Sequence, residues 1–164
     1  LSIKRRSFKM AKVGRASRNA SLMRVESVSG TKTIGAAETG EVYLVSAATS
    51  VTLPAPKAGA YFKFVITADI TSAAALVVNT DSTSTVMVGC VRRVVEGGTG
   101  HALDNAAVAQ AASADGHDKI VVGDGAAAIH PGSTLECLCD GTKWIVTGLV
   151  WANANSATVT FDDQ

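Results

Sequence analysis

Short apolar runs separated by turn residues make up the chain from residue 31 onward. The runs are rich in β-branched and aromatic side chains, and none repeats at the spacing of an amphipathic helix. They lie at 41–45, 50–53, 61–66, 75–78, 86–91, 119–122, 134–139, 144–147 and 157–161. Their near-regular spacing is typical of a sandwich or barrel. We therefore predict an all-β fold, a single β-sandwich or jelly-roll-like barrel domain over residues 31–164.

Two turns are marked clearly by their residue types. Pro54 and Pro56 each lack a main-chain donor, so the strand before them has to end, and Gly59 permits the turn into the aromatic run that follows. Asp140 and Gly141 form an Asp-Gly pair, which favours a tight hairpin between two strands.

Alternation within the strands predicts which side chains face the core. Phe62, Phe64 and Ile66 share one face of their strand, and Cys137 and Cys139 share one face of theirs. We expect the two cysteines to be buried free thiols, because three cysteines are too few and too odd for a disulfide framework. The candidates for the main core are Phe62, Phe64, Trp144 and Val146.

The segment 97–118 is the least regular part of the chain. It begins with a glycine-rich stretch and ends with Asp115 and Gly116, and its alanine-rich middle, 105–112, could form two helical turns. Long excursions of this kind are usually functional or mobile. We expect this loop to contact a neighbouring subunit or to project outward.

Charge divides the chain into two unlike parts. Residues 1–32 hold nine cations and one acid, a net +8, whereas residues 33–164 hold six cations and thirteen acids, a net −7, within a total of +1. We predict that residues 1–30 form an extended basic arm that something else must order. Such an arm is either a solvated tail or a strap that docks on an acidic surface or on nucleic acid. Its candidate docking residues are Lys4, Arg5, Arg6, Lys9, Lys12, Arg15, Arg18 and Arg24.

The beginning of the chain suggests an upstream translation signal. Arg5 and Arg6 lie just before Met10, and a purine-rich ribosome-binding sequence would translate as Arg-Arg. We therefore hypothesise that Met10 is the native start. No apolar run approaches the roughly 20 residues of a membrane-spanning helix, so we expect a soluble protein made in the cytoplasm.

No arrangement of residues predicts catalysis or a cofactor. Asp115, His117 and Asp118 could form an acid–base or metal cluster, with His130 elsewhere in the sequence, but ordinary turn chemistry explains them as well. Nucleic acid is not expected as a partner, because Phe8 is the arm's one stacking residue and the acidic body would repel phosphates. We predict a non-enzymatic protein without metal or cofactor.

Two stretches resemble a group of structural proteins from tailed bacteriophages. These are 50–65, with its Val-Thr-Leu-Pro-x-Pro and Gly-x-x-Phe-x-Phe-x-Val patterns, and 139–148, with its Cys-Asp-Gly-Thr-x-Trp hairpin. The resemblance spans roughly residues 33–150. Related β modules occur in capsid decoration (head-cement) proteins and in tail-fibre or spike proteins, and a short chain with one arm resembles the first group more.

The resemblance implies a decoration protein on the outer capsid surface of a virion, commonly a trimer, that stabilises the shell. Its partner would be the major capsid protein, and the assignment of the basic arm as the strap onto that protein rests on charge. The alternative is a host-recognition module associated with a tail fibre or spike. That function would need exposed aromatic side chains in a concave site, for which Tyr43 and Trp151 are the candidates, although either could belong to the core instead.

Overall fold

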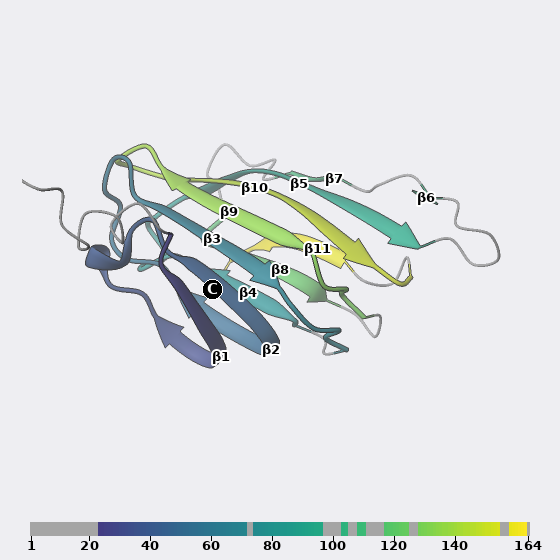
Figure 1. Cartoon of the computed structure of the whole chain (residues 1–164). Helices are drawn as coiled ribbons and strands as arrows, with labels where there is room; N and C mark the ends of the chain where they lie inside the picture. Colours follow the sequence, from purple (N-terminus) through teal and green to yellow (C-terminus); the bar gives the residue numbers. More distant parts are fainter. Residues whose placement is uncertain are drawn as a thin grey trace, which may run out of the picture.

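The computed structural model describes residues 23–71, 74–96, 103–104, 108–110, 117–124, 128–154 and 158–163. They form eleven strands and one short 3₁₀ helix (Figure 1). The elements are β1 (Val25–Thr33), η1 (Ala36–Glu38), β2 (Val42–Thr52), β3 (Tyr61–Ile66), β4 (Leu76–Asn79), β5 (Met87–Glu96), β6 (Leu103–Asp104), β7 (Val108–Gln110), β8 (Lys119–Asp124), β9 (Thr134–Cys139), β10 (Trp144–Ala152) and β11 (Thr158–Asp162). The predicted all-β fold is confirmed.

A corner in β1 and β2 organises the architecture. The two strands are parallel, but their register jumps from Val28↔Val45 to Gly30↔Thr49, which leaves three β2 residues bulged at the bend. Gly30 has a φ of +75°, a conformation that glycine adopts without strain. Both strands therefore fold back on themselves, and each contributes one half to each of two layers (Figure 1).

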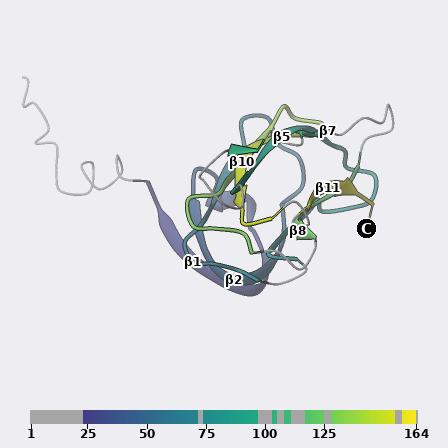
Figure 2. The same ribbon diagram turned by 90° about the vertical axis from the view of Figure 1, so that its right-hand side faces the viewer.

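The two halves of β2 start two layers. Residues 42–45 pair with β3, and the layer continues through β9 and β10 to β5. Residues 49–52 pair with β4, and that layer continues through β8 to β11. Seen end-on, β1 and β2 curve around one side and the layers enclose a nearly closed barrel (Figure 2). We call the β3-β9-β10-β5 layer the front layer.

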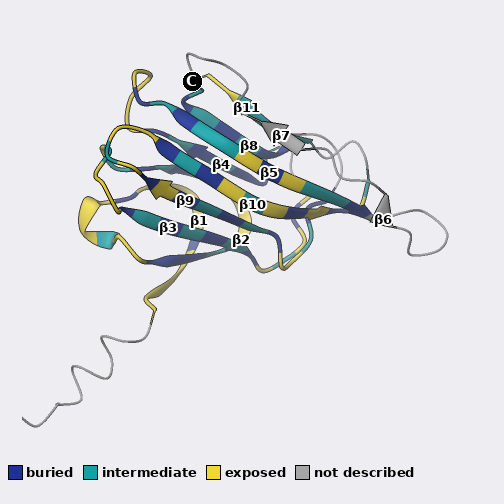
Figure 3. Cartoon of the chain, turned by 90° about the horizontal axis from the view of Figure 1, so that it is seen from above, coloured by how far each residue is buried: buried dark blue, intermediate teal, exposed yellow. Residues whose placement is uncertain are grey.

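The core lies between the layers and contains the predicted residues. Phe62, Phe64, Trp144 and Val146 have no exposed surface, and Cys137 and Cys139 are buried beside them. Strand alternation is visible as bands of buried and exposed residues along the front layer (Figure 3). The rings of Phe62 and Trp144 lie 5.8 Å apart, and Phe64 stacks on Tyr43 at 5.4 Å.

Both predicted turns are present. β2 ends before the proline pair, and Gly59 has a φ of +81°. At the β9–β10 hairpin, the Asp140 carboxylate accepts hydrogen bonds from the main-chain N–H groups of Thr142 and Lys143 at 2.9 Å each. This side chain therefore holds the turn in the shape that Gly141, with a φ of +111°, permits.

The structure differs from the sequence prediction in three places. The separate runs 41–45 and 50–53 are the two halves of the single strand β2, interrupted by its corner. The predicted boundary between residues 30 and 31 falls inside β1, which pairs with β2 along its whole length. Within the predicted helical stretch, residues 108–110 form β7 and pair with β5, so no helix covers them. The remainder of that stretch lies outside the described residues.

Candidate functional site

The described part of the basic arm is its root, where the chain enters β1. Seven of its eight candidate docking residues, Lys4 to Arg18, lie outside the described residues. Arg24 is largely exposed, and its guanidinium lies 3.4 Å from the Glu41 carboxylate. The main chain of Arg24 also accepts a hydrogen bond from the Val42 N–H at 2.8 Å. The arm is therefore tied to the body immediately before its first strand.

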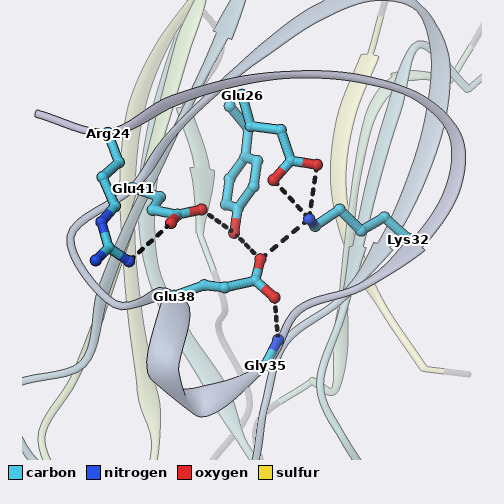
Figure 4. A network of polar contacts seen from close by, with 7 residues as sticks. Arg24, Glu26, Lys32, Gly35, Glu38 and Glu41 are labelled. Atoms are coloured by element: carbon cyan, nitrogen blue, oxygen red, sulfur yellow. Dashed lines mark hydrogen bonds and ion pairs between the residues drawn. The ribbon is translucent and has the colours of Figure 1, made fainter.

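A cluster of charged side chains lies beside this root and joins the two halves of β1. Glu26 belongs to the first half and Lys32 to the second, yet the Lys32 ammonium lies 2.7 Å from Glu26 and 3.0 Å from Glu38 (Figure 4). The corner in β1 makes this possible, since six residues of straight strand would separate the two side chains by roughly 20 Å. We call Arg24, Glu26, Lys32, Glu38, Glu41 and Tyr43 the charge clasp.

Tyr43 connects the charge clasp to the core. Its ring is fully buried, and its hydroxyl donates to Glu38 at 2.7 Å, with Glu41 at 3.3 Å. The hydrogen bond from Tyr43 is the largest cause that lowers the pKa of the Glu38 carboxyl, and burial opposes it. Burial lowers the pKa of the Lys32 ammonium, but hydrogen bonds and charges from its two glutamates outweigh it and raise the net pKa. Both groups are therefore charged at neutral pH.

The charge clasp is a set of ion pairs that holds two segments of the chain together. Oxygens of Glu26, Glu38 and Glu41 lie within 4.8 Å of one another, a spacing that a cation could bridge. Lys32 and Arg24 already supply positive charge to all three carboxylates. Lys32 also lies 5.1 Å from the centre of the Tyr43 ring. The arrangement thus fastens the ends of the two layers together at the point where the arm begins.

The histidines considered for catalysis lie in different places. His117 contacts Asp163 at 3.2 Å, whereas His130 contacts Asp69 at 2.6 Å. Asp118 is buried, and its main-chain carbonyl accepts from Thr80. Asp115 lies outside the described residues. Among the described residues, the structure therefore does not bring the candidate acid–base groups together.

The outer face of the front layer is the other candidate surface. Three of its side chains are large, apolar and exposed: Leu138 by 45%, Leu149 by 46% and Trp151 by 42%. At one end lies a hollow of about 450 Å³, lined by Val94, Pro131, Gly132, Leu149 and Trp151. The Trp151 ring also contacts the ring of His130, with centroids 4.7 Å apart. Leu149 and Trp151 are exposed at neighbouring outward positions of β10 beside this hollow, and exposed apolar side chains that lie together mark binding surfaces.

Of these surface features, the sequence indicated Trp151 but not the charge clasp. Sequence reasoning named Tyr43 and Trp151 together as candidate exposed aromatics, but Tyr43 is core and Trp151 is exposed. It missed the charge clasp, because nothing in the local pattern indicates that β1 turns a corner and brings Glu26 to Lys32. No described helix has the length and apolar character needed to cross a bilayer.

Comparison with known proteins leaves the chain without an assigned family. No family model matches it, and no curated protein or solved structure is significantly similar to it.

Proposed function

We propose that this chain is a structural virion protein that binds the outer surface of a tailed-phage capsid and stabilises the shell. In this proposal the basic arm binds the major capsid protein, the body assembles with further copies, and the protein has no catalytic role. The resemblance of residues 33–150 to phage decoration proteins suggests the class. The trimer that the resemblance implies belongs to the same proposal.

One observation carries the proposal: a concentrated basic segment joins an acidic all-β body through an anchored strand. Residues 1–22 contain seven cations and no acid. Directly after them, β1 pairs with β2 over its full length and the charge clasp ties its two halves. A pull on the arm is therefore transmitted to two layers of the body. That construction suits a strap better than a solvated tail.

Stabilisation of the shell would follow from linkage. A protein that binds the assembled lattice but not free or distorted subunits shifts the equilibrium toward the closed shell. Because a lattice offers many identical sites, moderate affinity at each site is sufficient. The arm would supply long-range attraction to an acidic capsid surface and then order on contact, at an entropic cost that the buried contacts must exceed.

The test measures binding to capsids that lack this chain. A full-length variant with the seven arm cations replaced by Gln should bind much more weakly, and binding of the unsubstituted chain should fall as salt increases. The control replaces Lys57 and Lys143, two exposed cations of the body, and should bind normally. Salt-independent binding, or equal binding by the arm variant, would refute the electrostatic strap.

A second candidate function is favoured by Trp151. The alternative of a fibre- or spike-associated recognition module needs an exposed aromatic in a concave site, and Trp151 meets that description. The hollow is mostly apolar, which suits a protein partner more than a polar glycan. Binding of the labelled chain to host cells, lost on Trp151→Ala, would favour this alternative. Absence of cell binding would remove it.

A further inference from the structure

The outward side chains of the front layer form four rows across its strands. The register aligns Tyr61, Leu138, Ile145 and Val88 in row one; Lys63, Glu136, Thr147 and Cys90 in row two; and Val65, Thr134, Leu149 and Arg92 in row three. Row four consists of Trp151 and Val94, with Pro131 and Gly132 beside them. Apolar side chains thus dominate the two ends of the face, and polar ones its middle.

The charge of this face differs from that of the body around it. Three side chains at its strand positions are charged at neutral pH, namely Lys63, Glu136 and Arg92, and they give a net +1. Residues 33–164 together carry −7. Lys63 and Glu136 also neutralise each other at 2.8 Å. Two copies of an acidic body would therefore repel each other less across this face than their net charge alone suggests.

We propose that the outer face of the front layer is the contact surface for a second copy of this chain, related by a twofold axis. The axis lies in the interface and crosses the strands between rows two and three, above Gly148 of β10. Each strand then lies antiparallel to its own copy. Row one faces row four, and row two faces row three, so the contact is isologous.

The side chains are complementary in this arrangement. Ile145 faces Trp151 of the other copy, and Val88 faces its Val94. Leu138, exposed by 45% at one end of the face, meets Pro131 and Gly132 at the lip of the hollow at the other end. No two like charges are directly opposed. Each apolar end of the face is therefore covered by the opposite end of its copy.

The size of the face fits such a contact. Four strands spaced by about 4.8 Å, and nine residues of β10 rising about 3.3 Å each, give a footprint of roughly 19 by 30 Å. Side chains project from this footprint, so its accessible surface area is larger than the flat area and approaches the roughly 800 Å² per partner of a standard interface. Aligned packing of two sheet faces about 10 Å apart is a common geometry.

The mass of the full-length chain in solution tests this contact, by light scattering or sedimentation. We expect two chains, or six where this twofold contact joins two of the trimers of the proposed function. Leu149→Asp should raise the dissociation constant of the contact by roughly a hundredfold, because a carboxylate would be buried in place of an apolar side chain in each copy, and the neighbouring Arg92 would offset only part of that cost. Leu138→Asp at the opposite end should act alike. Val25→Asp, at a β1 position exposed by 59%, is the matched control and should leave the mass unchanged.

Cys90 supplies an independent reporter, since it is exposed while the other two cysteines are buried. The twofold places its two copies on the order of 10 Å apart across the interface, so a bis-maleimide of that reach should link two chains. Cys90→Ser, and separately Leu149→Asp, should abolish the cross-link, although the second variant still takes up a single maleimide. A monomer, or a trimer unaffected by Leu149→Asp, would overturn the proposal. These measurements use the isolated chain, so their outcome does not depend on whether the protein binds capsids.

Discussion

Replacement of Lys32 by Met should weaken the fold far more than loss of an ordinary surface charge. Met keeps the apolar stem but removes the ammonium that joins Glu26 and Glu38. The three carboxylates of the charge clasp would then face one another with Arg24 as the remaining cation. The attachment between the two halves of β1 would lose its main polar contact.

The magnitude follows from the contacts of Lys32. A hydrogen bond to a charged group stabilises by roughly 1.5–3 kcal/mol, and the less exposed Glu38 partner belongs to this class. Glu26 is 45% exposed, so solvent reduces its share toward the roughly 0.5 kcal/mol of a surface pair. The ring of Tyr43 adds about 0.5–1 kcal/mol. We expect a loss of about 2–3 kcal/mol, because the residual contacts of Met offset part of the sum.

The assay is urea unfolding at several pH values, with Lys63→Met as the matched control. Lys63 pairs with Glu136 at 2.8 Å on the outer face of the front layer, and loss of this partly exposed pair should cost about 0.2–1 kcal/mol per chain. The lowered pKa of Glu38 means that its contribution is present above the ordinary value of 4.5 and is lost as pH falls through the lowered folded pKa. The cost of Lys32→Met should therefore shrink between about pH 5 and pH 3.

Two results would refute this reasoning. One is a Lys32→Met variant no less stable than Lys63→Met at neutral pH. The other is a difference between Lys32→Met and the unsubstituted chain that stays constant as the carboxylates are protonated.

Three further predictions concern the strands and the thiols. Gly89→Ala should destabilise the protein by more than about 3 kcal/mol in urea unfolding, because a Cβ at this position would overlap the facing main-chain carbonyl of β10. Gly40→Ala is the control: Gly40 also has a positive φ but has open space around it, so this substitution should cost only about 1 kcal/mol. Asp140→Ala should lower the melting temperature, since the hairpin N–H groups lose their acceptor, and Asp140→Asn should restore most of it. Burial raises the pKa of the Cys137 thiol, so a thiol reagent should modify Cys90 in the folded chain and Cys137 only after denaturation.

The strands of the core could be predicted because burial leaves a pattern in the sequence. Phe62 and Phe64 alternate with partly exposed residues, as a strand with one buried face requires. β1 leaves no such pattern, since Val28 is its one buried side chain and main-chain pairing holds the rest. The exposure of Trp151 could not be predicted from the sequence either. Alternation places this residue on one face of its strand but does not indicate whether other residues cover that face.

The charge clasp shows why the surface features were harder to predict than the core. Five of its six residues are ordinary charged side chains, and their contacts depend on a three-residue bulge in β2 that no local sequence pattern predicts. The alanine-rich stretch 105–112 illustrates a different difficulty. High helix propensity there yields to pairing of residues 108–110 with β5.

Cryo-electron microscopy of the intact phage particle tests the proposed function most directly. The account predicts density for this β-sandwich on the outer surface of the capsid shell, with the chain before β1 running along the major capsid protein. Density at the tail tip, or inside the head on the DNA, would contradict it.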